Sequence, residues 1–160
     1  MKKANRDAAI LLRILFFLYC LAMIYLLFFR SFGNTEGLTY QQQLQQNCNL
    51  IPFYTIDNYL YVIIHRSNPA LLGHCIINLA GHVLLFIPAG ILIPSIFCRQ
   101  QNFFRFLLTC AGIILAVETI QLLTLLGSFD VDDIILNLTG VILGFLSWKT
   151  YRIIRHKENS

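Results

Sequence analysis

The sequence predicts an all-α protein that crosses a membrane four times, and three observations carry this prediction. Hydrophobic residues make up 57% of the 160 residues and charged residues only 12%, about half of the charged fraction that is usual in a soluble domain. Long apolar stretches alternate with short polar or basic segments. The Lys and Arg residues gather at the ends of these stretches rather than inside them. We therefore expect a compact bundle of four transmembrane helices that forms a single domain.

The first apolar stretch, residues 14–29, follows a basic segment at 1–13 that contains Lys and Arg. A secretory signal peptide begins in the same way, but its apolar core is shorter, and the residues at 30–33 make a poor cleavage site. We expect an uncleaved transmembrane helix here.

A long polar loop at 30–70 follows the first helix. Its Gln-rich tract at 41–47 is typical of a solvated loop. The apolar piece around Tyr54, Tyr59 and Tyr61 is too short to cross a bilayer, and tyrosines favour the boundary between membrane and water. We expect a re-entrant turn or an interfacial helix across the outer mouth of the bundle.

The membrane core is expected at 71–148 and comprises three further helices. The first of these contains several Gly and Pro residues, so we expect it to be kinked or broken near Pro88. A short basic loop follows it, and a tight acidic turn precedes the last helix. The three spans are predicted at about 71–97, 106–126 and 133–148.

The distribution of positive charge predicts how the chain is oriented. Four spans place the N-terminal segment, the loop at 99–105 and a basic tail at 149–160 on the same side of the membrane. Ten of the 12 Lys and Arg residues then lie on that side, and cytoplasmic segments are the ones enriched in these residues. We expect a multi-pass protein of the cell membrane with both termini in the cytoplasm and the acidic turn outside.

Polar side chains stand at similar depth in the first two core helices. His74, Asn78 and His82 are spaced four residues apart, so they form one row along a helix. Glu118 lies about 13 Å below the acidic turn at 1.5 Å per residue, and Gln121 is one turn nearer to it. No Lys or Arg lies at the depth of Glu118, so this carboxyl group must accept hydrogen bonds or bind a ligand.

The last core helix brings a third set of polar groups to the same level. Asp133 and Asn137 share a face with two glycines, and two more carboxylates lie in the turn before it. Three separate segments thus predict a polar pocket that opens outward, with Glu118 deepest. Structural alternatives remain open: the asparagines can join helices, the glycines can allow close packing, and the turn carboxylates can cap the last helix. The residues concerned are Asn78, Asn137, Gly140, Gly144, Asp130 and Asp132.

Metal and cofactor binding are not expected. His74, His82 and Glu118 would match a set of two histidines and one carboxylate, which is a known catalytic zinc set, but the chain has no HExxH motif. The five cysteines show neither CxxC nor metal-ligand spacing, and a disulfide framework is not expected.

Five ordered motifs resemble the VanZ-like family of small bacterial membrane proteins. They run from Asn49 to Phe53, from Asn78 to Gly90, through Glu118 and Gln121, from Gly127 to Asp133, and from Asn137 to Gly144. The resemblance covers about residues 49–146 and implies a role at the cell envelope, since members are associated with resistance to the glycopeptide teicoplanin. The family often has Arg where this chain has Ser128. The motif positions expected to be structural are Asn49, Pro52, Phe53, Gly81, Pro88, Gly90, Gly127, Gly140 and Gly144.

The functional prediction is a VanZ-like membrane protein that acts at the outer leaflet on envelope components and contributes to glycopeptide resistance. A lipid-linked or anionic envelope ligand, the lipid bilayer and further copies of the chain are the expected partners; nucleic acid is not. One alternative is a membrane enzyme for lipid-linked substrates with Glu118 as general acid or base. Another is a small oligomeric transporter. The expected ligand-binding residues are Asn78, His82, Gln121, Asp130, Asp132, Asp133 and Asn137.

Overall fold

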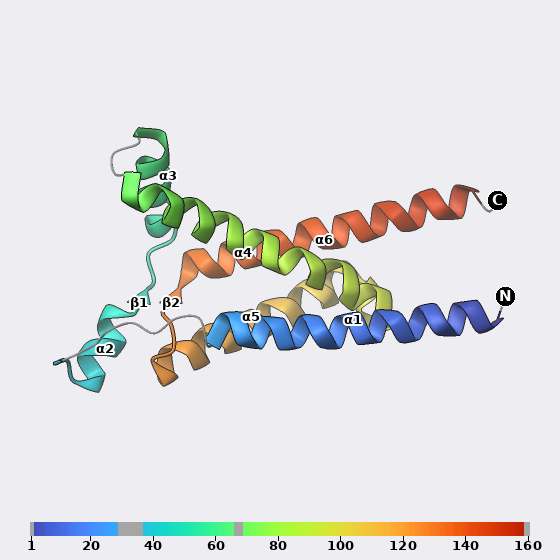
Figure 1. Cartoon of the computed structure of the whole chain (residues 1–160), viewed down its shortest axis with the longest axis horizontal. Helices are drawn as coiled ribbons and strands as arrows, with labels where there is room; N and C mark the ends of the chain where they lie inside the picture. Colours follow the sequence, from blue (N-terminus) through green and yellow to red (C-terminus); the bar gives the residue numbers. More distant parts are fainter. Residues whose placement is uncertain (1, 29–36, 66–68, 159–160) are drawn as a thin grey trace.

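Four long apolar helices form the body of the protein in the computed structural model, which describes residues 2–28, 37–65 and 69–158 (Figure 1). Each of the four is long and apolar enough to cross a membrane. The prediction of an all-α polytopic membrane protein is therefore confirmed. The four helices are α1 (Lys2–Phe28), α4 (Pro69–Ile96), α5 (Phe103–Thr124) and α6 (Val131–Glu158).

Two of these helices are longer than the sequence predicted. α1 begins at Lys2, within the basic segment, and α6 continues through the basic tail to Glu158. Lys and Arg are good helix formers, and extending an existing helix costs far less than starting one. The positive charges of the tail also favour the C-terminal end of the α6 dipole.

Both termini lie at one end of the bundle (Figure 1). The turn between α4 and α5, which contains the short 3-10 helix η1 (Cys98–Gln101), lies toward the same end. The opposite end carries α2 (Tyr40–Gln46), α3 (Tyr54–His65) and two short strands. This arrangement brings the basic segments of the sequence together and places the acidic turn far from them.

α4 and α6 pack most closely, because glycines let their backbones approach. A Cβ atom added at Gly144 would come within 2.8 Å of the Gly90 Cα atom, and one added at Gly140 would strike the carbonyl of Val83. Gly140 and Gly144 therefore act in helix packing, as the structural alternative proposed. Below this contact, Phe145 packs against Phe106 with ring centres 4.8 Å apart.

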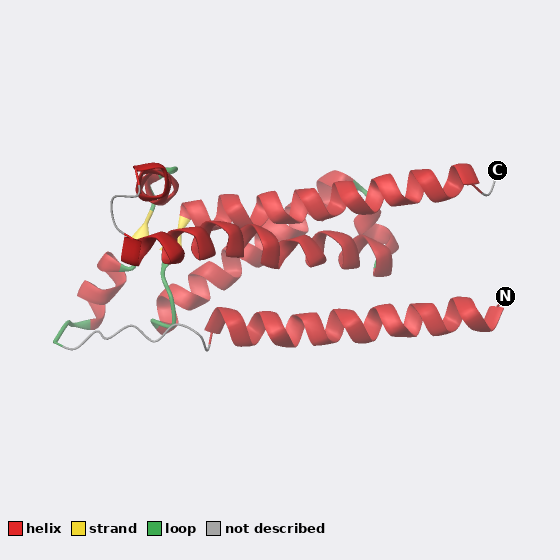
Figure 2. Cartoon of the chain, turned by 45° about the horizontal axis from the view of Figure 1, so that its top comes forward, coloured by secondary structure: helices red, strands yellow, loops and turns green. Residues whose placement is uncertain are grey.

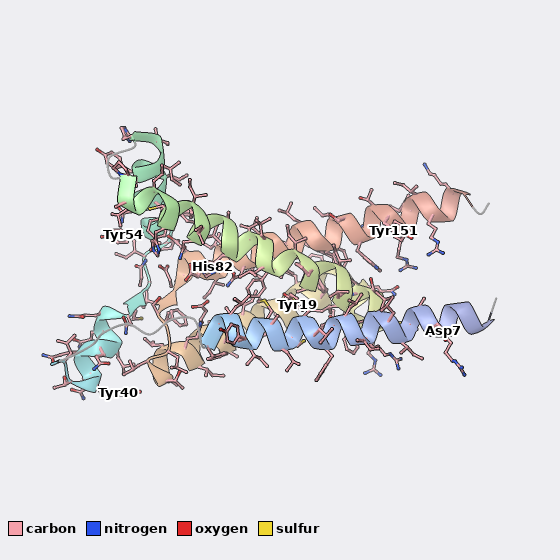
Figure 3. The ribbon with its side chains drawn as sticks, in the orientation of Figure 1. Asp7, Tyr19, Tyr40, Tyr54, His82 and Tyr151 are labelled. Atoms are coloured by element: carbon pink, nitrogen blue, oxygen red, sulfur yellow. The ribbon has the colours of Figure 1, made fainter. Side chains whose placement is uncertain are left out.

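α1 is held at the margin of the bundle, and Figure 2 shows it apart from the other long helices. Among its described side chains, only Met23 is buried. The Tyr19 hydroxyl, seen pointing toward α4 in Figure 3, donates to the Leu85 carbonyl at 2.9 Å. At the C-terminal end of α1, Gln121 Nε2 donates to the Leu27 carbonyl at 2.7 Å. These two bonds supplement the apolar packing of α1 on its neighbours.

One local prediction was wrong, and one of the two alternatives in another is excluded. The Gln-rich tract is a helix, α2, rather than a loop, because Thr39 caps it and Gln42 completes a reciprocal capping box. α4 is not broken near Pro88: it continues through Pro88 and Pro94 to Ile96. Membrane helices tolerate proline where neighbours satisfy the freed backbone groups. The broken helix that motivated the transporter alternative is thus not present.

α3 is the helix that stands in place of the predicted re-entrant or interfacial segment. It contains 12 residues, too few to cross a bilayer. Figure 2 views α3 nearly end-on while the long helices run across the picture, so α3 lies across the bundle axis. A helix and not a re-entrant turn is therefore formed.

A pair of parallel strands joins this end of the molecule together. β1 (Cys48–Asn49) precedes α3, and β2 (Phe129–Asp130) precedes α6. In their register Cys48 faces Phe129 and Asn49 faces Asp130. No sequence pattern predicted this pairing, because two residues per strand carry no periodic signal.

Candidate functional site

A polar pocket of about 320 Å³ lies between the end of α1, the first half of α4, α5 and the start of α6. Each of the three core helices contributes polar side chains to it, and the turn before β2 contributes Gly127 and Ser128. Three separate segments therefore meet at one level, at the end opposite to the termini. The polar lining side chains are His74, Asn78, His82, Glu118, Gln121, Ser128 and Asp133.

Two buried acceptors in this pocket have no hydrogen-bond partner among the described residues. They are the Oε2 atom of Glu118 and the Oδ1 atom of Asn78. Glu118 is only 3% exposed. An unmet buried acceptor costs about 1–3 kcal/mol, so both atoms favour a ligand that donates hydrogen bonds.

His82 links α4 to two side chains of α6. Its Nδ1 atom lies 3.1 Å from Asn137 Oδ1, and its Nε2 atom lies 3.3 Å from Asp133 Oδ1. Because an amide oxygen only accepts, this orientation places a hydrogen on Nδ1. The Nε2 atom then faces a carboxylate oxygen, and these two atoms require one proton between them. Asn137 is buried and does not line the pocket, so it positions the His82 ring from behind.

Asp132 does not line the pocket. It is fully buried, and both carboxylate oxygens accept backbone N–H groups at the start of α3. Oδ1 accepts from Phe53 at 2.5 Å, and Oδ2 accepts from Thr55 at 2.8 Å and Ile56 at 3.0 Å. Asp132 thus caps a helix that lies more than 70 residues earlier in the chain.

Asp130 is satisfied in the same way. Its Oδ2 atom accepts the Thr55 hydroxyl at 2.6 Å, and its Oδ1 atom accepts the Asn49 amide at 3.2 Å. The Asp132 N–H also donates to Asp130 Oδ1 at 2.9 Å, which caps the start of α6. We call Asn49, Thr55, Asp130 and Asp132 the acidic latch. Ligand binding by its two carboxylates stays a prediction, and the contacts show them fully engaged with protein.

The remaining motif positions divide between the latch and the helix contacts. Phe53 has a left-handed backbone (φ 66°), which is uncommon for a residue other than glycine, and its N–H is held by Asp132. Pro52 precedes it and is exposed. Gly127 lies against Gln121, where a Cβ atom would come within 3.2 Å of the Gln121 Cβ atom. Gly81 lines the pocket and has open space where a Cβ atom would stand.

Two residues that were not predicted as site residues also belong to this region. Thr55 connects the latch to α3, and no sequence signal marked it, because its partner is 75 residues away. The Tyr59 hydroxyl lies 3.5 Å from Nε2 of His74, so α3 also reaches the pocket lining. Burial raises the pKa of Tyr59, and the nearby Cys75, Asp133 and Asp130 add to the shift.

Within residues 2–28, 37–65 and 69–158, no group of three His, Cys, Asp or Glu residues is arranged to hold a metal ion. His74 and His82 both line the pocket, but each is engaged by a different partner, Tyr59 and Asp133. The polar side chains that line this site can form hydrogen bonds and transfer protons.

Comparison with known proteins gave one match. The family model described as VanZ/LLP1 matches residues 16–154, which include the second half of α1, all of α4 and α5, most of α6 and the acidic latch. Searches of the curated proteins and of the solved structures found no match.

Proposed function

This chain belongs to the VanZ/LLP1 family, and we propose that it binds the hydroxyl- or amine-bearing headgroup of a cell-envelope lipid in the polar pocket. The observation that carries the proposal is the pair of unpartnered buried acceptors, Glu118 Oε2 and Asn78 Oδ1. Ligand pockets in proteins span about 300–1,000 Å³. A volume of about 320 Å³ suits a headgroup rather than a whole lipid.

The charge of the pocket favours a donor-rich ligand over an anionic one. Glu118 and Asp133 both face it, and among the described residues its lining contains no Lys or Arg. One of the two Gln121 amide hydrogens is already used by the Leu27 carbonyl. Sugar hydroxyls or an ammonium group would meet the open acceptors, whereas a phosphate would set its own acceptor oxygens against them.

Ser128 also favours a ligand that is not anionic. The family often has Arg at this place, and in this chain Ser128 lines the pocket near the two carboxylates. An arginine there would offset their charge and offer donors to an anion. With serine the pocket keeps its acidic character, so we propose that this protein prefers a neutral or cationic headgroup.

We place the pocket at the outer leaflet. It lies at the end opposite to both termini, and ten of the 12 Lys and Arg residues of the sequence belong to segments at the terminal end. The positive-inside rule then makes the terminal end cytoplasmic. On this basis we propose that the protein acts on envelope components from outside and contributes to resistance to teicoplanin-type glycopeptides.

The proposal is tested by measuring the binding of a lipid-linked disaccharide to the purified protein in detergent. Glu118→Gln and Asn78→Leu each remove one open acceptor, and each is expected to weaken binding about tenfold or more. The matched controls are Asp57→Asn and Asn58→Leu, which make the same changes on exposed α3 residues and should bind like the wild type. Equal binding by all five proteins would refute the proposal.

A membrane enzyme is the second candidate, and the His82–Asp133 contact favours it. A proton shared between Nε2 and the carboxylate at 3.3 Å stands in the same pocket as Glu118. General acid–base chemistry requires such groups beside the substrate. Incubation of the protein with the lipid-linked disaccharide decides between the two functions: an enzyme forms a new product that disappears in Glu118→Gln, and a binding protein returns the ligand unchanged.

A further inference from the structure

A second pocket, of about 770 Å³, lies at the opposite end of the bundle, where α5 begins and α6 approaches its C-terminus. Its walls combine an aromatic part with a basic part. The aromatic part consists of Phe103, Phe145 and Trp148, and the basic part consists of Lys149, Arg152 and Lys157. The function proposed for the polar pocket leaves this second one without a role.

No described side chain neutralises the positive charge of this basic pocket. None of the described residues that line it is acidic. Arg152 donates to Gln101 Oε1 at 2.7 Å, and its guanidinium group lies 5.1 Å from the centre of the Trp148 ring. Both partners are uncharged, and no ion pair involves Lys149 or Arg152 within the described residues. The pocket therefore presents preorganised cationic donors to an anion.

The backbone adds a further attraction for negative charge. α5 begins at the pocket, where Asn102 caps the helix and accepts the N–H of Arg105 at 3.1 Å. The positive end of a helix dipole of 22 residues thus lies beside the basic side chains. Basic groups and a helix N-terminus together are the recurring surroundings of a bound phosphate.

The aromatic wall indicates where the phosphate comes from. The Phe145 ring centre lies 5.4 Å from that of Phe103 and 5.2 Å from that of Trp148, so the three rings form a continuous apolar surface. On α5, Phe104 is 80% exposed and Leu108 is 77% exposed, as expected of side chains that face lipid. Tryptophan at the end of a membrane span favours the level of the lipid headgroups. A soluble anion would not use this apolar wall.

We propose that this pocket binds an anionic phospholipid of the leaflet at the terminal end, with its phosphate among Lys149, Arg152 and Lys157. The glycerol and upper acyl carbons lie along Phe103, Phe145 and Trp148. Basic pockets between transmembrane helices are known to take up such headgroups. The bound lipid holds α5 and α6 together at the end of the bundle that lacks the acidic latch.

The test uses the full chain in zwitterionic detergent, titrated with phosphatidylglycerol or phosphatidylcholine and followed by native mass spectrometry and by the midpoint of thermal unfolding. Phosphatidylglycerol should bind about tenfold more tightly than phosphatidylcholine and raise the midpoint. The double variant Lys149→Gln, Arg152→Gln should lose at least about tenfold of this affinity, since each basic group adds a comparable attraction.

Arg105→Gln is the matched control. Arg105 is exposed, lies at the same end of the bundle and does not line the pocket, so its removal should leave phosphatidylglycerol binding unchanged. An equal loss in Arg105→Gln would show nonspecific charge attraction and overturn the proposal. Equal affinity for both lipids would also overturn it. The same holds if inorganic phosphate saturates the pocket at the same concentration as phosphatidylglycerol. A negative result in this titration concerns only the basic pocket. It does not contradict the function proposed for the polar pocket.

Discussion

Asp132 and Asp133 are neighbours at the start of α6, but their carboxylates have different surroundings. Asp132 is fully buried and accepts three backbone N–H groups of α3 and the residue before it. Asp133 lines the polar pocket, where its Oδ1 atom lies 3.3 Å from Nε2 of His82. The first carboxylate is saturated by protein and holds a loop in place. The second belongs to a pocket in which two acceptors stay open.

The difference shows how to separate structural from ligand-binding acidic residues in a membrane bundle. A buried carboxylate whose oxygens are all filled by backbone N–H groups stabilises the fold. A buried carboxylate with an open oxygen beside a pocket costs stability and serves a site. By this criterion the contacts of the acidic latch are structural, and the functional part that we propose consists of Glu118, Asp133 and His82.

The largest effect is expected for Asp132→Asn compared with Asp133→Asn. Both oxygens of Asp132 accept N–H groups, so in either orientation an asparagine amide would face an N–H donor. We expect a loss of about 3 kcal/mol or more in the free energy of unfolding, and less than about 1 kcal/mol for Asp133→Asn. Unfolding in detergent, followed by circular dichroism, measures both. Similar losses in the two variants would contradict the division drawn here.

A smaller loss is expected when the latch loses one hydroxyl. Thr55→Val removes the 2.6 Å bond to Asp130 Oδ2 and leaves that oxygen short of a donor, at a cost of about 1–2 kcal/mol. Thr139→Val is the control, because the Thr139 hydroxyl donates to the Ile135 carbonyl within its own exposed helix turn. The same unfolding measurement should find the control near the wild type. An unchanged free energy of unfolding in Thr55→Val would show that Thr55 does not stabilise the latch.

Glu118→Gln tests the other side of the comparison. Glutamine keeps the shape of the side chain and removes the cost of a buried charge, so the free energy of unfolding should change by less than about 1 kcal/mol or increase. Resistance to teicoplanin in cells that express the variant should nevertheless fall to the level of cells without the protein. Expression level and membrane insertion serve as controls. If the variant gives the same resistance as the wild type, the carboxylate of Glu118 is dispensable and the residue acts only in packing.

The smallest effect concerns the link between α3 and the pocket. The pKa of Tyr59 is raised above its ordinary value of 10.0, chiefly by burial. Its contribution to stability is therefore complete below about pH 10 and is lost as the pH rises through the folded-state pKa. In Tyr59→Phe, stability should decline less between pH 9 and 11 than in the wild type. Parallel pH profiles would show that this hydroxyl does not ionise differently in the folded protein.

The local pattern of the sequence was sufficient for the membrane fold and for part of the site. Four apolar stretches predicted the four long helices, because their length and composition suffice to recognise a membrane span. The spacing of four residues placed His74, Asn78 and His82 in one row, and all three line the polar pocket. The same reasoning put Gly140 and Gly144 on a single face of α6, where they contact α4. These features depend only on helical periodicity.

Tertiary structure decided which acidic residue does what. Asp130, Asp132 and Asp133 are indistinguishable in the sequence, and their roles follow from donors on Asn49, Phe53 and Thr55, between 75 and 81 residues away. The pairing of β1 with β2 brings those donors to the start of α6. Helical periodicity specifies the face on which a side chain lies, but the partner that fills each oxygen comes from a distant segment, so only the folded chain could reveal it.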